Sequence, residues 1–254
     1  MSKKNARWRK LDNAAKLYSA ASNKKDTRVF RFYCELKEEV NPKALQEALN
    51  QTIETFPTFL MVLRKGFFWH YLEPCNLRPI VKEEYKEPCS RLYIRDKKTL
   101  LFEVTYYKKR INFEVFHVLT DGTGATEFLK ELVKNYLYLV HKEEGLEQIT
   151  LLPEDMTVQD QEDDSFLKYY SKNQKRPKKK KLNAFQIRRK KKDGNHLHVH
   201  ESVVSVQAVL KRSRELGVSM TVFLTALFMM AINEEMSKMQ KKKPVVLMVP
   251  VNLR

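Results

Sequence analysis

The sequence predicts an α/β fold, because strand-like and helix-like patterns of apolar residues follow one another along the chain. Two apolar segments, 100–107 and 111–118, flank a short basic turn and predict a β-hairpin. The segment after them carries apolar residues at helical spacing and predicts a helix over about 123–141. Hydrophobic residues make up 43% of the 254 positions, which is enough to bury a sizeable core.

The N-terminal part of the chain predicts a strand, a helix and another hairpin. Residues 28–37 place apolar side chains on one face, as a strand does. Asn41 can cap the next segment and Pro57 stops it, so a helix is expected between them. Two short apolar runs, 59–63 and 67–72, then predict a hairpin.

The C-terminal part alternates between charged and apolar stretches. A surface excursion is expected over about 153–181, where acidic and then basic residues gather. The longest apolar run, 222–232, is shorter than the roughly 20 residues that span a bilayer, so a buried helix over 219–237 is expected instead. The other predicted elements are a helix over 206–216 ended by Gly217 and strands over 182–187, 196–205 and 245–254.

Composition excludes several classes of protein. The chain has 48 Lys and Arg against 31 Asp and Glu, a formal charge of +17, and 6 glycines that form no nucleotide-binding loop motif. Cys34, Cys75 and Cys89 are dispersed and form no CxxC pair, which argues against a disulfide framework or a metal site. The charged N-terminus has no apolar core for a secretory signal. We therefore expect a cytoplasmic protein without a membrane span.

The segment FHVLTDGTGATEFL carries the strongest chemical signal. His117 ends a predicted strand, Asp121 lies in the turn, and Gly122 comes just before a helix. A strand end can hold an imidazole rigidly, and histidine titrates near neutrality, so His117 is a candidate general base. Asp121 is expected to hold the turn rather than to do chemistry. Gly122 is expected to permit a backbone angle or a close approach that a Cβ would block.

These residues give the chain a resemblance to the CoA-dependent acyltransferase superfamily, which includes chloramphenicol acetyltransferases, condensation domains and alcohol acetyltransferases. The HxxxDG signature of that family is matched by His117, Asp121 and Gly122, and the chain resembles bacterial alcohol acetyltransferase-like proteins most. Further stretches resemble the family's landmarks in the same order: WRKLDNAAKLYSA (8–20), NPKALQEALNQTIETFPTF (41–59), AFQI (184–187), ELGVSMTVFLTALFMMAI (215–232) and VVLMVPVNLR (245–254).

The resemblance implies a chloramphenicol acetyltransferase-like fold, a mixed β-sheet with helices packed on it. It also implies acetyl transfer from acetyl-CoA, a co-substrate rather than a permanently bound cofactor, to a small-molecule alcohol. His117 would be the base, and Arg254 would pair with Asp121 to support the catalytic turn. No residue can be assigned to CoA binding from the sequence.

Two departures from the family pattern matter. Many members carry two histidines at the start of the motif, whereas this chain has Phe116 before His117. Family members also have two similar halves with the active site between them, and residues 1–254 correspond to the N-terminal half alone. We therefore expect the C-terminal half to be supplied in cis or in trans.

Other features leave alternatives open. The basic runs 175–181 and 188–192 could bind nucleic acid or attract the phosphates of CoA, but without interleaved aromatic residues we favour a solvated loop and no nucleic-acid partner. His196, His198 and His200 alternate along one strand, and we favour an exposed strand face over a metal site there. A condensation-type catalyst acting on carrier-protein thioesters and a non-catalytic basic binding module remain as rival functions.

Overall fold

The computed structural model describes residues 8–23, 26–67, 69–95, 97–142, 183–187 and 199–249. The chain divides into two compact units, Met1–Tyr169 and Tyr170–Arg254. The first unit is a mixed α/β structure, which confirms the predicted fold class.

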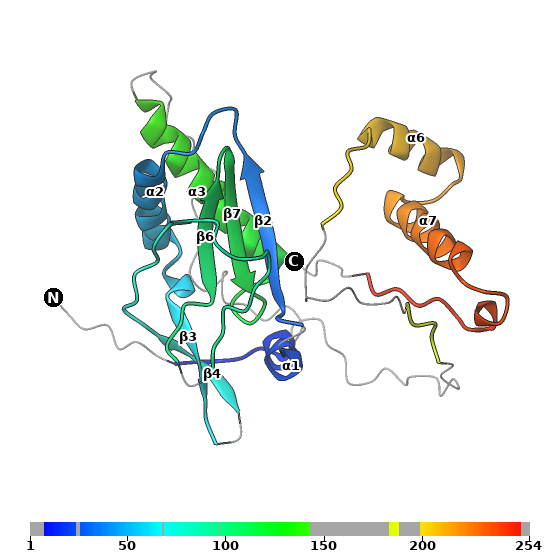
Figure 1. Cartoon of the computed structure of the whole chain (residues 1–254), viewed down its shortest axis with the longest axis horizontal. Coiled ribbons are helices and arrows are strands. Elements are labelled where there is room, and N and C mark those ends of the chain that lie inside the picture. Colours follow the sequence, from blue (N-terminus) through cyan, green and yellow to red (C-terminus); the bar gives the residue numbers. More distant parts are fainter. Residues whose placement is uncertain are drawn as a thin grey trace. The chain divides into compact units, whose positions relative to one another are not determined.

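A four-stranded sheet organises the first unit (Figure 1). Its strands are β2 (Val29–Glu35), β7 (Arg110–Phe116), β6 (Phe102–Tyr107) and β5 (Lys82–Glu83), in that order across the sheet. β7 pairs antiparallel with both β2 and β6, and β5 adds to β6 in parallel. The predicted hairpin is confirmed as β6 and β7, with Tyr107 opposite Arg110 and a tight turn in which Lys108 has φ of 50°.

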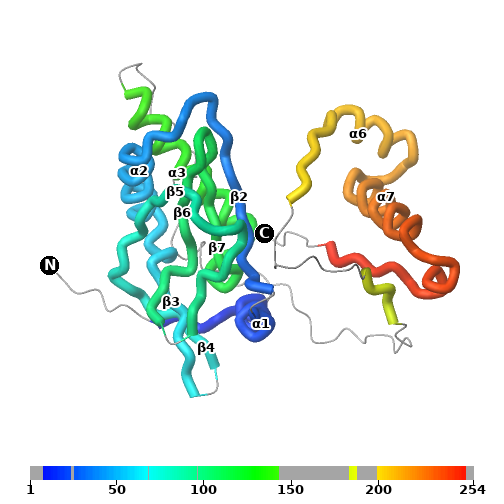
Figure 2. The backbone as a smooth tube through the Cα atoms, viewed as in Figure 1, coloured from blue at the N-terminus to red at the C-terminus, as the bar shows by residue number. Residues whose placement is uncertain are grey.

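A smaller sheet contains β1 (Arg9–Lys10), β4 (His70–Pro74) and β3 (Met61–Lys65). β3 and β4 form the other predicted hairpin, which extends as a separate arm in Figure 2. Both strands begin later than predicted, and for β3 the reason is that η1 (Pro57–Phe59) occupies the residue at which it was expected to start. The short strand β5 was not predicted, whereas β1 lies in the stretch 8–20, for which the resemblance implied an opening strand.

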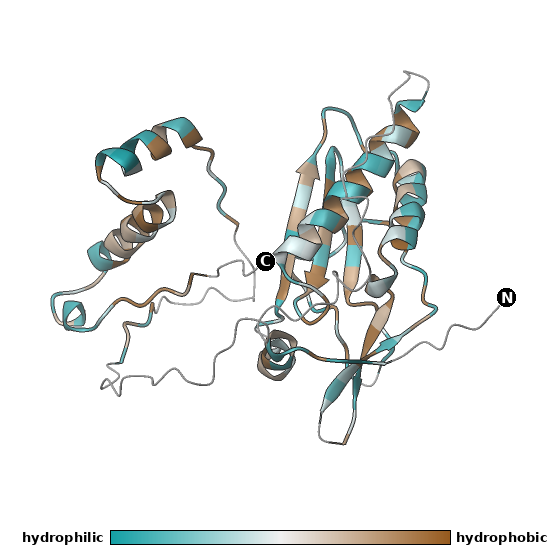
Figure 3. Cartoon of the chain, turned by 180° about the vertical axis from the view of Figure 1, so that it is seen from behind, coloured by the Kyte–Doolittle hydropathy of each residue, from teal (hydrophilic) through white to brown (hydrophobic). Residues whose placement is uncertain are grey.

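Two helices cover one face of the larger sheet, as the view from behind shows (Figure 3). They are α2 (Pro42–Thr55) and α3 (Gly122–Val140), and both were predicted. The Asn41 side chain caps α2 by accepting hydrogen bonds from the N–H groups of Lys43 and Ala44 at 3.0 and 3.2 Å. Aromatic rings fill the space between these helices and the sheet; they belong to Phe56, Phe59, Phe102, Phe113 and Phe128.

The opposite face of the sheet holds a buried ion pair that the sequence did not indicate. Arg31 of β2 donates from Nε to Glu114 of β7 at 2.8 Å, and the Glu114 side chain is only 3% exposed. The N–H of Cys89 donates to the same carboxylate oxygen at 2.6 Å, and Arg31 also pairs with Glu84. The segment between β4 and β6, which contains Glu84 and Cys89, therefore supplies partners for the charged side chains on this face of the sheet.

A further helix, α1 (Asn13–Ala21), follows β1 and lies beside the start of β2 (Figure 1). Asp12 caps it by accepting a 2.6 Å hydrogen bond from the N–H of Ala15. Leu11 and Ala15 are buried in the core, so α1 is anchored at its N-terminal end.

The second unit contains α6 (Val206–Glu215), α7 (Met220–Glu234) and η3 (Gln240–Lys242). Both long helices were predicted, and Gly217, with φ of 66°, follows α6 in the left-handed conformation expected at a helix end. The expected burial of the second helix is wrong: α7 has no buried residue, and Phe228 and Met230 are 58% and 60% exposed. A helix that is apolar all round needs cover on every side, and in the described part of its unit it packs on α6.

The predictions of three C-terminal strands are wrong for every residue of them that the structure describes. No strand forms in residues 183–187, 199–205 or 244–249. The first and last of these segments share a backbone hydrogen bond, from the Phe185 N–H to the Pro244 carbonyl at 3.0 Å. Strand propensity yields a strand only beside a hydrogen-bonded partner, and the described residues of this unit form no ladder. The predicted excursion at 153–181 lies outside the described residues, as do 196–198 and 250–254.

No single helix within the described ranges has both the length and the apolar character of a membrane span. One bent pair, α6 with α7, meets these criteria jointly across an 89° bend.

Candidate active site at the end of β7

His117 directly follows β7 and continues the strand's helix-covered face. Its backbone N–H donates a 3.0 Å hydrogen bond to the carbonyl of Arg28, which extends the pairing of β7 with β2 by one residue. The chain then turns sharply, with the Leu119 N–H bonded to the Phe116 carbonyl at 2.8 Å. The imidazole is therefore carried on a backbone that is fixed on both sides.

Two aromatic side chains contact the His117 ring. Tyr18 of α1 stacks on it with ring centroids 4.3 Å apart and planes at 15°. Phe30 of β2 lies equally close, at 4.3 Å, with its plane tilted by 39°. The imidazole thus lies in an aromatic setting and remains partly exposed.

Burial lowers the pKa of His117 below its usual 6.5, because the charged imidazolium loses solvation. The backbone of Thr120 and the charge of Asp121 act in the opposite direction, whereas the charge of Arg28 lowers the pKa further. The imidazole is therefore neutral at pH 7, the state in which it can accept a proton. Its Nδ1 atom is buried and has no hydrogen-bond partner among the described residues.

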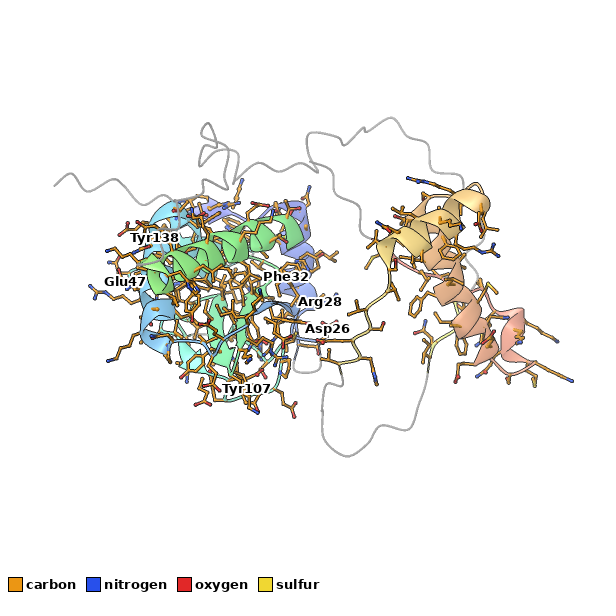
Figure 4. The ribbon with its side chains drawn as sticks, turned by 90° about the horizontal axis from the view of Figure 1, so that it is seen from above. Asp26, Arg28, Phe32, Glu47, Tyr107 and Tyr138 are labelled. Carbon is orange, nitrogen blue, oxygen red and sulfur yellow. The ribbon has the colours of Figure 1, made fainter. Side chains whose placement is uncertain are left out.

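The turn before β2 is tightly bonded. Arg28 has φ of 55°, an uncommon conformation for a residue with a side chain, and it pairs with Asp26 at 2.9 Å. The Thr27 hydroxyl donates to the Cys89 carbonyl at 2.7 Å, and the Ser22 hydroxyl donates to the Thr27 carbonyl at 3.2 Å. Figure 4 shows Asp26 and Arg28 side by side at this edge of the unit.

Asp121 is the N-cap of α3. Its Oδ1 accepts a 2.9 Å hydrogen bond from the N–H of Gly124, and the residue is exposed. Arg254 lies outside the described residues, so its pairing with Asp121 stays a prediction.

Gly122 does not need to be glycine for the reason expected. It lacks a positive φ, and a Cβ placed on it would meet its nearest neighbour, Phe32 Cζ, at an ordinary 4.0 Å. The close approach is at Gly124, where a Cβ would lie 2.2 Å from the Thr120 hydroxyl oxygen. The expectation for Gly122 is corrected accordingly: the turn is tight at Gly124, because the Asp121 cap draws the Gly124 N–H inward.

Sequence reasoning missed three residues around His117. Tyr18 and Phe30 contact its ring, and Arg28 accepts a hydrogen bond from its backbone N–H. All three residues belong to segments that are remote from His117 in the sequence. The one available signal was that Tyr18 belongs to the stretch 8–20, which carries part of the family resemblance.

No group of three or more metal-binding side chains occurs in the part of the chain that the structure describes. His196 and His198 lie outside that part, and His200 is exposed. The basic runs 175–181 and 188–192 also lie outside it.

No protein-family model matches the sequence, and comparison with curated proteins gives no match. Several solved structures are similar. The starter condensation domain of rhizomide synthetase is 12% identical with a TM-score of 0.45, over 54% of this chain and 39% of that chain. Polyketide synthase associated protein 5 from Mycobacterium tuberculosis is 17% identical with a TM-score of 0.41, over 57% and 36%.

The first condensation domain of the calcium-dependent antibiotic synthetase, solved with a substrate analogue, is 13% identical with a TM-score of 0.45, over 57% of this chain and 42% of that chain. A variant of the rhizomide synthetase domain was solved in complex with C8-CoA. The chain spans 36–42% of the length of the three domains and proteins compared above. These are distant similarities of fold.

Proposed function

We propose that the protein is an acyl-CoA-dependent O-acyltransferase that transfers an acetyl group from acetyl-CoA to a small-molecule alcohol. The observation that carries the proposal is the setting of His117. This histidine stands in an HxxxDG motif at a strand end, on a backbone bonded to Arg28, with burial lowering its pKa so that the ring is neutral at pH 7.

The reaction needs one base and no covalent enzyme intermediate. The neutral His117 imidazole accepts the proton of the acceptor hydroxyl, and the oxygen forms a bond to the thioester carbonyl carbon. The carbon–sulfur bond then breaks, and the departing CoA thiolate takes the proton back from the imidazolium. An ester and free CoA are the products, and the histidine returns to its neutral form.

Asp121 and the start of α3 support this chemistry indirectly. By capping α3, Asp121 fixes the turn that follows His117, and its charge favours the imidazolium formed during the reaction. A second half of the protein, joined in cis or added in trans, would complete the binding site for acyl-CoA. The cytoplasm, where we expect the protein, supplies this co-substrate.

The test uses the full-length gene product with acetyl-CoA and a panel of primary and secondary alcohols. Release of CoA thiol that depends on the alcohol, together with the matching acetyl ester in mass spectra, is the expected result. Activity confined to acyl groups on carrier-protein thioesters would favour a condensation-type catalyst. Salt-dependent binding of nucleic acid without any transfer would favour a basic binding module.

A further inference from the structure

Tyr18 is the side chain most closely aligned with the candidate base. Its ring lies nearly parallel to the His117 imidazole, with 15° between the planes and 4.3 Å between the centroids. This geometry is that of a face-to-face aromatic contact, whereas Phe30 meets the same imidazole at 39°.

We propose that Tyr18 is a positioning residue for His117: its ring sets the plane of the imidazole and shields one face of it from water. The inference rests on the proposed role of His117 as the base, and it assigns to α1 a part in the site that the sequence did not reveal.

The imidazole needs such support because the backbone of Thr120 is the one hydrogen-bond partner indicated for its ring among the described residues, and a single hydrogen bond does not fix the ring plane. A catalytic histidine is usually held by a hydrogen bond at the nitrogen that does not react. Here Nδ1 is buried without a hydrogen-bond partner among the described residues. The outer torsion of a histidine side chain has a broad minimum, so the ring plane must be set by neighbouring groups. Among the described residues, Tyr18 and Phe30 are the two rings that contact it.

The helix that carries Tyr18 is well placed to hold it. Asp12 caps α1, and Leu11 and Ala15 are each only 4% exposed. At the other end of the helix, the Ser22 hydroxyl donates to the Thr27 carbonyl, next to the Arg28 carbonyl that accepts the His117 N–H. The Tyr18 ring and the His117 backbone are therefore tied to the same turn.

Within the described part of the chain, four side chains act on the charge of His117 together with the backbone of Thr120, whose hydrogen bond raises the pKa of His117. Tyr18 of α1 and Phe30 of β2 contribute low-polarity surface, and Arg28 before β2 contributes a positive charge. Asp121 at the start of α3 contributes a negative charge. Burial is the largest influence on the pKa of His117, so removing the Tyr18 ring is expected to raise that pKa toward 6.5.

The experiment compares Tyr18→Leu with Tyr18→Phe in the full chain. Tyr18→Phe keeps the ring, and Tyr18→Leu keeps an apolar side chain without one. Tyr138→Leu is the control, because Tyr138 is also a half-buried helical tyrosine but lies toward the far end of α3 from Phe32 and Arg28 (Figure 4). The readouts are the pKa of His117 from NMR titration of labelled histidine and, in the active full-length protein, kcat and KM.

We expect Tyr18→Leu to raise the pKa of His117 and to lower kcat about tenfold with little change in KM, a part of the roughly hundredfold contribution of a general base. Tyr18→Phe and Tyr138→Leu should match the wild type in both readouts. An unchanged pKa and kcat in Tyr18→Leu would overturn the inference, as would a fall in the pKa.

A second measurement covers the case in which Tyr18→Leu does not fold. In the wild-type chain, nuclear Overhauser effects should connect the Tyr18 and His117 rings, and their absence would overturn the inference. Neither NMR measurement needs substrate. If the wild type shows these signals but transfers no acyl group, the proposed function fails and the positioning of the ring by Tyr18 stands.

Discussion

The backbone N–H of His117 donates a 3.0 Å hydrogen bond to the carbonyl of Arg28, a residue held at φ of 55°. A side chain in this left-handed conformation costs on the order of 1–2 kcal/mol. The strained residue of the turn before β2 is thus the one that accepts the hydrogen bond from the backbone of the candidate base. Strained backbone is often found at functional sites.

Substituting Arg28 separates this strain from the charge of the guanidinium. Arg28→Ala keeps the Cβ and therefore the strain, whereas Arg28→Gly removes both. The glycine variant should therefore be more stable than the alanine variant by about 1 kcal/mol in urea unfolding. Both variants should raise the pKa of His117, because they remove a positive charge that lowers it. Equal stability of the two variants would show that the backbone at this position is relaxed.

The two glycines of the turn should respond differently to alanine. Gly124→Ala places a Cβ 2.2 Å from the Thr120 hydroxyl oxygen and should destabilise the protein by about 1–3 kcal/mol. Gly122→Ala meets nothing closer than 4.0 Å and should change stability by less than about 1 kcal/mol. Adding Thr120→Ala to Gly124→Ala should recover part of the loss in a double-mutant cycle. Additive effects would contradict the predicted contact.

The Arg31–Glu114 pair should be much more sensitive than an exposed ion pair. Arg31→Met leaves the Glu114 carboxylate buried without its cation and should cost about 3–5 kcal/mol in the free energy of unfolding. Arg64→Met is the control in the same unit, since the 2.9 Å Arg64–Glu73 pair has side chains 35% and 39% exposed and should cost about 1 kcal/mol or less. A small loss in both variants would mean that water reaches Glu114.

Substitutions at Asp121 can show whether its carboxylate acts only as a helix cap or also forms a salt bridge. Asparagine caps helices as well as aspartate does, so Asp121→Asn should leave stability nearly unchanged if capping is the whole role, while Asp121→Ala should cost about 1 kcal/mol. Asp121 is exposed here. If the full-length protein buries it in a pair with Arg254, Asp121→Asn should lose roughly 3–5 kcal/mol, and Arg254→Met should lose a similar amount. Thermal unfolding of these three variants decides between the two roles.

Local patterns predicted those parts of the fold that local interactions determine. The β6–β7 hairpin closes through a two-residue turn, and α2 and α3 carry their own caps, Asn41 and Asp121. The position of His117 at the end of β7 followed from the same local pattern. Helix α1, which is only nine residues long, was missed although Asp12 is a standard cap and most of its residues are apolar.

Contacts between remote segments could not be predicted. The stacking of Tyr18 on His117 and the Arg31–Glu114 pair depend on how the chain brings α1, β2 and β7 together. In the C-terminal segments, local composition predicted structure that depends on such contacts. Residues 244–249 have a strand-forming composition but pair with no strand among the described residues. Helix α7 has the composition of a core helix, but none of its residues is buried by the described part of the chain. Composition specifies a need for partners and does not supply them.

The central claim is that His117 is the base of an acyl transfer, and the pH dependence of the reaction tests it most directly. In the full-length protein, alcohol-dependent release of CoA from acetyl-CoA should fall as the pH drops through the pKa of His117, because protonation removes the base. Since burial lowers that pKa, the fall should be centred below pH 6.5. His117→Ala should lower kcat at least about a hundredfold and abolish this acid limb, while His70→Ala in β4 should leave both unchanged. Near-normal turnover by His117→Ala would contradict the account.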